Sequence, residues 1–296
     1  MEKCIAFVLG GGGSRGALQV GAVRALVEAG IIPDLLVGTS IGAVNATGLA
    51  LWGIDSNGIN KLEQAWGDVA NANMLDPRVS QLIFRILVGR PSSRARKKAE
   101  SYFISQGVTR GLTFYMVPYT RLALVSANLE TGQPIIYGQD RGDQVLEGLL
   151  TSISVPPWFL PLMKDGQMIV DGGALTTLPI EPALRMGATE IFALDLDDNA
   201  LIPKVNLTLL QYFEQYFYAA SRRHIRLETE IARMQGIPVH HVDFRGLSTK
   251  PIWDFSDYKA LIEAGYNKTQ HVISEWNRKA QTNPALLRPE HERLPA

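Results

Sequence analysis

Three short motifs carry the residues of this chain that could do chemistry. They are the run GGGGSRG at residues 10–16, the segment GTSIG at residues 38–42 and the segment DGG at residues 171–173. In that order they supply bare backbone amides that can bind an anion, a hydroxyl nucleophile and a carboxylate. A serine attacks an acyl carbonyl only after a base removes its proton, so these are the parts needed to break an acyl bond.

Ser40 is the candidate nucleophile. It lies at the centre of a G-x-S-x-G motif, between the apolar residues 35–37 and the alanine-rich apolar residues 41–51. The first segment predicts a short buried strand and the second a helix. A strand-to-helix turn with small flanking residues exposes the hydroxyl on a tight corner, and the amides that begin the helix face any developing negative charge.

The glycine run can be interpreted in two ways. Residues 11–16 match the G-x-G-x-x-G dinucleotide fingerprint. A Walker phosphate-binding loop is a separate possibility, and it is excluded because no Gly-Lys-Ser/Thr follows the glycines. The dinucleotide fingerprint also needs an acidic residue after the second strand. Asp34 precedes the second predicted strand, which leads into Ser40 instead.

We therefore favour an oxyanion hole over a dinucleotide site. Its donors would be backbone amides of the glycine run, each contributing roughly 3–4 kcal/mol in favourable cases. The candidate residues of this oxyanion hole are Gly11, Gly12, Gly13 and Arg15. The arginine either orders the loop or adds positive charge to it, and the sequence leaves both roles open.

Asp171 is the candidate base. It follows the short apolar segment 168–170 and precedes two glycines, so its carboxylate can lie exposed at a tight turn. A Ser-His-Asp triad in the chain order Ser, Asp, His could use His240 or His241. No histidine of the chain lies in a glycine-rich context typical of a catalytic position. A Ser–Asp dyad is the simpler prediction, with the triad and a non-catalytic nucleotide- or lipid-binding regulator as alternatives.

The segments around the motifs predict an α/β fold. The first 51 residues contain two strand–turn–helix units, which indicate a parallel sheet with helical crossovers. Later strands are expected at residues 119–127, 134–137, 168–170, 191–196 and 239–244. Later helices are expected at residues 143–152, 181–186, 207–234 and 256–276. The aromatic cluster of the long helix is predicted to pack in a core or against a partner helix, with a wall of an acyl-chain pocket as the alternative. The cluster comprises Tyr212, Phe213, Tyr216, Phe217 and Tyr218.

We predict one domain over residues 1–281, with a helical insert at 57–111 and a loose tail at 282–296. The insert is expected to contain helical pieces at 59–69 and 79–88, and it could serve as a lid over an apolar site. It carries a basic run, Arg90, Arg94, Arg96, Lys97 and Lys98. Such a run is typical of a solvated face, and contact with lipid phosphates is the alternative.

Composition narrows the class of protein. The 296 residues carry 29 basic and 29 acidic side chains, so no overall field favours nucleic acid as a partner. The single cysteine, Cys4, excludes an intramolecular disulfide, and we expect it to be buried and inert. No segment approaches the roughly 20 apolar residues of a membrane-spanning helix. We expect a cytoplasmic protein whose contact with a membrane is at most peripheral, at the inner face.

Together these residues resemble the patatin-like phospholipase family. That family carries G-G-G-x-[RK]-G, G-x-S-x-G and D-G-[GA] motifs in this order, and the chain has GGGSRG at 11–16, GTSIG at 38–42 and DGG at 171–173. The small-residue segment TSISVP at 151–156 and the segment EAGY at 263–266 are softer matches. The resemblance extends over about residues 4–270.

The resemblance implies a three-layer α/β/α fold with a mainly parallel central sheet and an acyl-enzyme mechanism. Ser40 would attack an ester of a phospholipid or related lipid, Asp171 would accept its proton, and amides near Gly11, Gly12 and Gly13 would hold the oxyanion. No metal or other cofactor is implied. Ser14 and Ile41 stand where the family often has alanine, and the bulk of Ile41 bears on substrate size.

Overall fold

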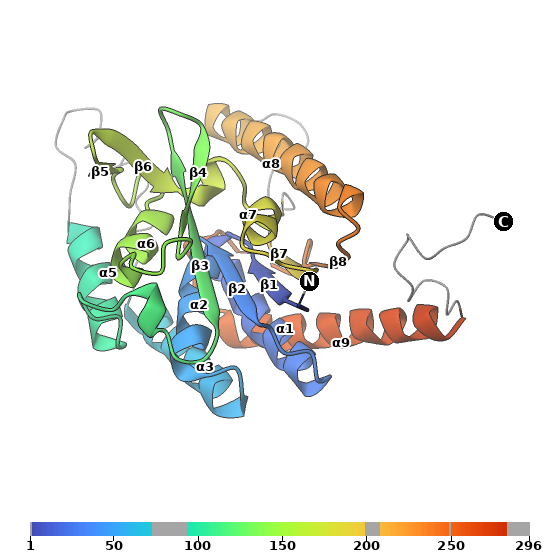
Figure 1. Ribbon diagram of the computed structural model, residues 1–296. Coiled ribbons are helices and arrows are strands. Elements are labelled where there is room, and N and C mark those ends of the chain that lie inside the picture. The colour runs from blue at the N-terminus through green and yellow to red at the C-terminus, as the bar shows by residue number, and fades with distance from the viewer. Residues whose placement is uncertain (1, 73–93, 199–207, 249, 283–296) are drawn as a thin grey trace.

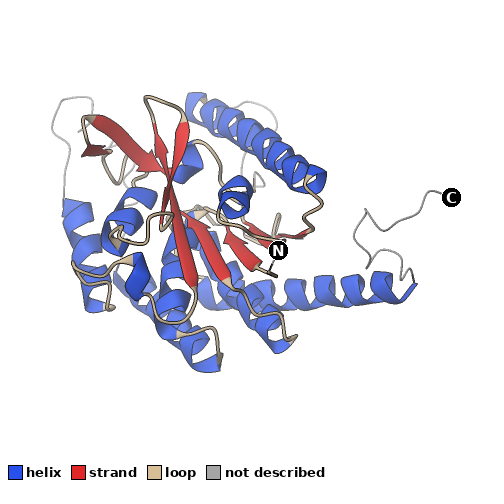
Figure 2. Cartoon of the chain, viewed as in Figure 1, coloured by secondary structure: helices blue, strands red, loops and turns tan. Residues whose placement is uncertain are grey.

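The computed structural model describes residues 2–72, 94–198, 208–248 and 250–282. Within these residues the chain forms an eight-stranded sheet between two layers of helices (Figures 1 and 2). The strands are β1 (Ile5–Leu9), β2 (Leu35–Thr39), β3 (Arg121–Asn128), β4 (Gln133–Tyr137), β5 (Leu162–Lys164), β6 (Gln167–Asp171), β7 (Glu190–Asp195) and β8 (Val239–Asp243). The helices are α1 (Ala17–Glu28), α2 (Ile41–Trp52), α3 (Ser56–Ala72), α5 (Arg94–Ser105), α6 (Val145–Ser152), α7 (Ile180–Arg185), α8 (Leu209–Met234) and α9 (Tyr258–Thr282).

The sheet has a parallel centre and an antiparallel end. Its strand order is β5-β6-β3-β2-β1-β7-β8, and β4 pairs with β3 outside this path. The five strands β3, β2, β1, β7 and β8 pair in parallel, whereas β4, β5 and β6 pair antiparallel. Two parallel strands need a crossover connection between them, and here helices form the crossovers. The predicted α/β sheet is confirmed.

Two hydrophobic cores, one on each face of the sheet, make the fold three-layered. Along β1, Phe7 and Leu9 belong to the core that includes α1, α2 and α9, whereas Ala6 and Val8 belong to the core that includes α7 and α8. Side chains of a strand alternate between the two faces of the sheet, so one short apolar strand can contribute side chains to both cores. The three-layer prediction is therefore confirmed, and Cys4 is buried as expected.

The aromatic cluster of α8 does not pack in a core of the described residues, and its packing against a partner helix stays a prediction. Tyr212, Phe213, Tyr216 and Phe217 are 54% to 70% exposed. The half of α8 that is buried lies further along the helix, where Ile225 and Ala232 join the core beneath it. In Figure 1 one end of α8 extends past α7. The three-residue strand β5 was not among the strands expected from the sequence.

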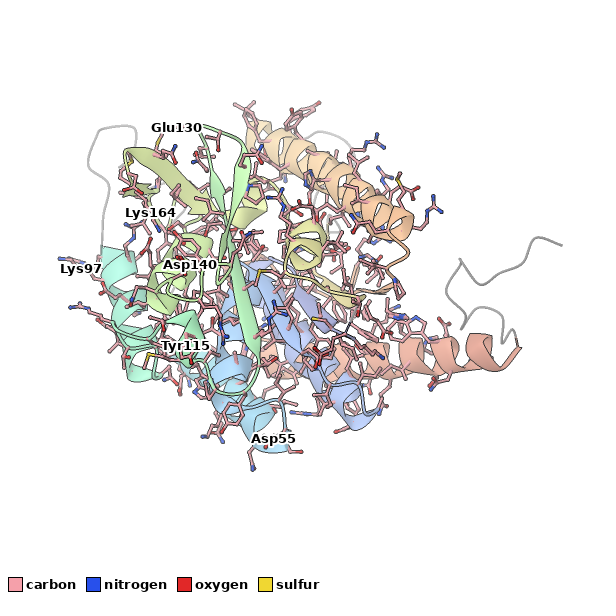
Figure 3. All side chains as sticks on the ribbon, viewed as in Figure 1. Asp55, Lys97, Tyr115, Glu130, Asp140 and Lys164 are labelled. Atoms are coloured by element: carbon pink, nitrogen blue, oxygen red, sulfur yellow. The ribbon has the colours of Figure 1, made fainter. Side chains whose placement is uncertain are left out.

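The insert forms part of the helical layer as α3 and α5. The expected helix at 79–88 and Arg90 lie outside the described residues, as does most of the predicted tail, 283–296. Lys97 projects away from the body in Figure 3, as expected for a solvated face. Arg96 instead donates to the carbonyl of Leu160. The single-domain boundaries and the lid stay predictions.

Candidate active site

Ser40 occupies the turn between β2 and α2 in a strained backbone conformation. Its φ is 57° and its ψ is −125°. Among the described non-glycine residues only Asp165 shares a positive φ. A residue held in this sparsely populated region needs support from its surroundings, and such strain concentrates at functional sites. The G-x-S-x-G motif thus forms the sharp strand-to-helix corner that the sequence predicted.

Close backbone packing explains the two glycines of that motif. A Cβ atom at Gly38 would lie 2.4 Å from the carbonyl oxygen of Gly42, and one at Gly42 would lie 2.1 Å from the carbonyl oxygen of Leu9. Both distances are far below van der Waals contact, so a side chain at Gly38 would push α2 away from β2, and one at Gly42 would push α2 away from β1. The glycines therefore allow the start of α2 to lie against the sheet.

The register of β3 brings Asp171 next to Ser40. Thr39, the last residue of β2, pairs with Val125 in parallel, and Asp171, the last residue of β6, pairs with the next residue, Ser126, in antiparallel fashion. Because β4 occupies the other edge of β3 along this stretch, β2 and β6 share one edge and meet end to end. The nucleophile and the carboxylate each lie where one of these two strands ends.

The carboxylate of Asp171 is buried, and only one of its two oxygens has a hydrogen-bond partner. The residue is 5% exposed, its Oδ1 accepts the N–H of Gly173 at 2.7 Å, and its Oδ2 has no hydrogen-bond partner. Burial raises the pKa of Asp171 to about 7, although the Ser40 side chain and the Gly173 N–H act to lower it. The Ser40 hydroxyl is thus close enough to influence the carboxylate without satisfying Oδ2 in a well-formed hydrogen bond.

The glycine run lies against the serine. A Cβ atom at Gly11 would be 3.1 Å from the Cβ atom of Ser40. The N–H of Gly11 donates to the carbonyl of Thr177 at 2.7 Å, so in this conformation it cannot also bind an oxyanion. The N–H groups of Gly12 and Gly13 donate to no other described residue. Of the three N–H groups predicted to bind the oxyanion, those of Gly12 and Gly13 have no other described acceptor.

The contacts of Arg15 match the loop-ordering role. Its Nε donates to the carbonyl of Gly12 at 3.3 Å, and its Nη1 donates to the carbonyl of Asp198 at 3.0 Å. Burial lowers the pKa of Arg15, and Asp198, Asp197 and Asp195 offset part of this effect. The guanidinium therefore links the glycine run to the segment that follows β7.

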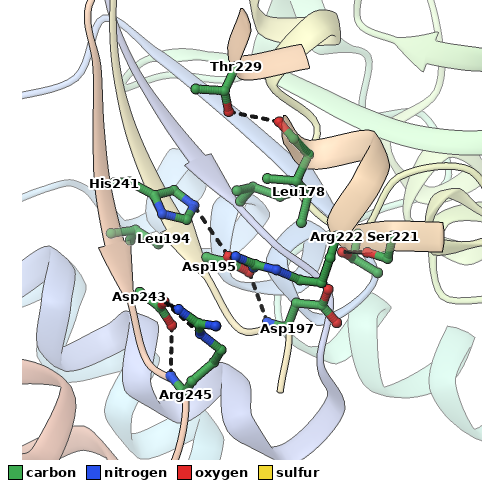
Figure 4. Close-up of polar contacts among 12 residues, drawn as sticks. Leu178, Leu194, Asp195, Asp197, Ser221, Arg222, Thr229, His241, Asp243 and Arg245 are labelled. Carbon is green, nitrogen blue, oxygen red and sulfur yellow. Dashed lines mark hydrogen bonds and ion pairs between the residues drawn. The ribbon is translucent and has the colours of Figure 1, made fainter. Parts of the chain in front are cut away.

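A polar cluster lies at the end of β7, close in sequence to the Asp198 carbonyl that Arg15 contacts (Figure 4). Asp195 accepts the N–H of Asp197 at 2.9 Å and a hydrogen bond from Arg222 of α8. Burial acts to raise the pKa of Asp195, but His241, the Asp197 N–H and Arg222 hold it below its usual value. Burial and repulsion from Asp195 raise the pKa of Asp197 to about 6. The cluster couples the end of β7 to α8 rather than to Ser40.

The two candidate histidines lie far from the serine. Both are on β8, which β1 and β7 separate from β2; three strand spacings amount to roughly 14 Å. His240 bonds to Glu190 at 2.9 Å and stacks on Phe192, and His241 lies 3.2 Å from Asp195. These contacts argue against the Ser-His-Asp alternative.

Residues that sequence reasoning did not assign hold the site in place. The Ser152 hydroxyl accepts the N–H of Ser40 at 3.0 Å and donates to the carbonyl of Val125 at 2.7 Å. The carbonyl of Ser154 accepts the N–H of Asp171 at 3.1 Å. Both serines fall in the TSISVP segment that the resemblance singled out, yet nothing in their spacing tells what they contact.

Within the described residues, no group of three or more His, Cys, Asp or Glu side chains is arranged to hold a metal ion. In the same part of the chain, every helix is too short or too polar to cross a bilayer.

The fold and site define an α/β protein with a strained serine at a strand-to-helix turn beside a buried carboxylate. The family model described as patatin-like phospholipase matches residues 7–184, so the chain belongs to this family. It is 28% identical over 204 residues to "Lysophospholipase NTE1" of Mycosarcoma maydis, an alignment that covers 66% of this chain and 10% of that protein. It is 27% identical over 318 aligned positions to "Uncharacterized NTE family protein MT2641" of Mycobacterium tuberculosis, covering 97% of this chain and 48% of that one.

The chain therefore spans half or less of the length of these curated relatives. Among solved structures it is similar to VipD from Legionella pneumophila, with 14% identity and a TM-score of 0.46 over 93% of this chain and 67% of that chain.

Proposed function

We propose that this chain hydrolyses fatty-acyl esters of phospholipids or related lipids, with Ser40 as nucleophile and Asp171 as base. The observation that carries the proposal is the buried, partnerless Oδ2 of Asp171 beside the strained serine. A carboxylate whose pKa lies near 7 is suited to accept and return a proton at neutral pH. Membership of a family named for phospholipases supports the lipid substrate.

The reaction would proceed through an ester on Ser40. The serine oxygen bonds to the substrate carbonyl carbon as its proton passes to Asp171, and the amides of Gly12 and Gly13 bind the oxyanion that forms. When the intermediate collapses, the leaving alkoxide takes the proton from Asp171 and the acyl group stays on Ser40. Water then attacks the ester, again losing its proton to Asp171, and the fatty acid leaves as Ser40 recovers a proton.

A long-chain fluorophosphonate, with the adduct located by mass spectrometry, tests the proposal. We expect labelling at Ser40 that is lost in Asp171→Asn and retained in His240→Ala and His241→Ala. Hydrolysis of acyl esters should disappear in Ser40→Ala. Undiminished hydrolysis in Ser40→Ala would refute the proposed nucleophile, and loss of labelling in the histidine variants with little effect of Asp171→Asn would favour the triad. Saturable dinucleotide or phospholipid binding without any serine adduct would favour the non-catalytic regulator.

A further inference from the structure

A chain of buried hydrogen bonds connects three helices to the glycine run. Its members are Trp66 of α3, Asn45 of α2 and Gln19 of α1, which are 4%, 0% and 0% exposed. The Trp66 indole N–H donates to Asn45 Oδ1 at 2.9 Å, and Asn45 Nδ2 donates to Gln19 Oε1 at 2.9 Å. Gln19 Nε2 then donates to the carbonyl of Gly10 at 2.9 Å. The hydrogen bonds therefore run in one direction, from the insert to the start of the glycine run.

The orientation of both amides follows from the indole. A tryptophan side chain can only donate, so the atom of Asn45 that faces it must be the amide oxygen. Asn45 Nδ2 then faces two acceptors, Gln19 Oε1 and the carbonyl of Gly16 at 2.9 Å. Gln19 Nε2 likewise faces two carbonyls, that of Gly10 and, at 3.3 Å, that of Leu194. Both amide nitrogens thus have two acceptors each, as their complete burial requires.

The amide pair of Gln19 and Asn45 holds both ends of the glycine run. Gln19 binds the carbonyl of Gly10, where the run begins, and Asn45 binds the carbonyl of Gly16, directly before α1. Glycine has more backbone freedom than any other residue, so a run of glycines does not fix its own conformation. Hydrogen bonds from outside the run must do so, and the amide pair supplies one at each end.

The bond to Gly10 fixes the peptide unit that precedes the amides proposed to bind the oxyanion. The carbonyl of Gly10 and the N–H of Gly11 belong to this one planar unit. Gln19 holds the unit at its oxygen, and the loop that follows β6 accepts its N–H. The next two peptide units carry the N–H groups of Gly12 and Gly13. The direction of these two N–H groups therefore depends on a plane that Gln19 helps to fix.

Asn45 also connects the glycine run to the nucleophile. It belongs to α2, the helix that begins directly after Ser40. Its bonds to Gly16 and Gln19 attach α2 to the start of α1, where the glycine run ends. The amide pair therefore helps to set the distance between the nucleophile and the backbone amides. An oxyanion hole accelerates a reaction only when its donors already point at the position of the oxyanion.

Packing alone does not account for the amide pair. Residues beside the two amides in the sequence, Leu18, Val20 and Ala46, belong to the apolar core. Apolar side chains of similar size would fill the same space and would need no hydrogen-bond partners. The pair is retained in this core with every amide nitrogen and oxygen paired, which fits a role in orienting the backbone that it binds.

We propose that Gln19 and Asn45 are positioning residues of the reaction, which aim the N–H groups of Gly12 and Gly13 at the oxyanion. The proposal rests on the proposed function, because the oxyanion forms only when Ser40 attacks an acyl carbonyl. Both side chains are fully buried, so they act through the backbone of the glycine run and not by contact with substrate. Loss of the Gln19 amide should weaken binding of the oxyanion and leave the nucleophile and its base unchanged.

The first test compares p-nitrophenyl butyrate with its thiono analogue, in which sulfur replaces the carbonyl oxygen. Sulfur accepts hydrogen bonds weakly, so well-aimed donors favour the oxygen ester. Gln19→Met keeps the length of the side chain and removes the donor to Gly10. It should lower kcat for the oxygen ester by about tenfold to a hundredfold, no more than deletion of one oxyanion donor costs, with little change in KM.

Two further readouts of Gln19→Met distinguish positioning from a general structural role. The ratio of kcat/KM for the oxygen ester to that for the thiono ester should fall by at least about fivefold, because only the oxygen ester depends strongly on the donors. The pH dependence of kcat/KM should keep the wild-type apparent pKa near 7, because Asp171 is not affected. If Gln19→Met lowers the rates for both esters equally, the proposal is overturned.

Thr269→Val is the matched control. Thr269 is fully buried on α9, and its hydroxyl donates to the carbonyl of Gly265 in the same helix at 2.8 Å. The substitution removes a buried hydrogen bond in the layer that contains α1 without touching the glycine run. It should therefore leave the ratio between the two esters unchanged, and a fall equal to that in Gln19→Met would overturn the proposal.

Two other variants keep the test sharp if Gln19→Met folds poorly. Trp66→Phe keeps an aromatic ring in place and removes only the N–H that orients Asn45, so the ratio between the two esters should fall by about two- to threefold. Asn45→Leu removes the bonds to Gly16 and Gln19 and should lower the ratio further. An unchanged ratio in both variants overturns the proposal even when Gln19→Met is insoluble.

Amide hydrogen exchange of residues 10–16, measured by mass spectrometry, separates this proposal from the proposed function. Gln19→Met should raise the exchange rate of this segment severalfold, and Thr269→Val should not. If exchange rises in this way but the wild type hydrolyses neither ester, the amide pair anchors the glycine run and the proposed function fails. If the wild type hydrolyses the oxygen ester through Ser40 but Gln19→Met changes neither the ratio nor the exchange, the positioning role fails alone.

Discussion

Asp171→Asn should stabilise the protein at alkaline pH while removing its activity. Burial raises the pKa of Asp171 from 3.8 to about 7, so the ionised carboxylate destabilises the folded state. At about 1.4 kcal/mol per pH unit, the difference between these two values corresponds to about 4 kcal/mol of lost stability at pH 8. An asparagine at this position carries no charge and so escapes this penalty.

The substitution also has an energetic cost. The balance between this cost and the carboxylate penalty decides whether the variant is more or less stable than the wild type. The asparagine oxygen can still accept the Gly173 N–H, but its amide nitrogen would occupy the buried Oδ2 position, which has no partner. An unsatisfied buried donor costs about 1–3 kcal/mol. The carboxylate penalty is larger, so we expect a net gain of about 1–3 kcal/mol at pH 8.

The pH dependence follows from the raised pKa. Below about pH 3 the carboxyl group is protonated in both the folded and the unfolded state, so the penalty is absent. As the pH rises toward 7, the unfolded state ionises and the folded state does not, and wild-type stability falls. The advantage of Asp171→Asn over the wild type should therefore shrink by about 2–3 kcal/mol between pH 8 and pH 5.

Urea unfolding followed by tryptophan fluorescence at pH 8 and pH 5 measures both values. Ser40→Ala is the control, because it should abolish activity while keeping the buried carboxylate, so its stability should still fall between pH 5 and pH 8. A stability difference between Asp171→Asn and the wild type that is the same at both pH values would refute the reasoning. So would an Asp171→Asn variant that is less stable than the wild type at pH 8.

Three further predictions concern the same site. Because the base must be ionised, kcat/KM for a short ester should rise with pH through an apparent pKa near 7, and a profile flat from pH 5 to 9 would contradict this. Ser152→Ala leaves the Ser40 N–H without its acceptor, so urea unfolding should show a loss of about 1–3 kcal/mol and ester assays a reduced kcat. Gly42→Ala should prevent soluble folding, since its Cβ would lie 2.1 Å from a carbonyl oxygen, whereas Gly111→Ala, with open space around it, should express normally.

Much of the fold could be predicted because its signals are local. The apolar runs at 5–9 and 35–39 and the alanine-rich helix at 41–52 alternate with glycine turns, which is the pattern of parallel strands with helical crossovers. The aromatic half of α8 shows where this reasoning fails. Helical spacing predicts a common face for these residues, but it does not tell whether another element covers that face.

The sequence by itself determined the candidate nucleophile and base, because a G-x-S-x-G turn and a D-G-G turn are local chemistry that can be recognised without a partner. Only the tertiary structure decided that β2 and β6 meet end to end on one edge of β3, since this depends on the pairing register of residues distant in the chain. The same packing buries Asp171, leaves its Oδ2 without a partner and raises its pKa. Pairing register and burial belong to the assembled sheet, and no short motif encodes them.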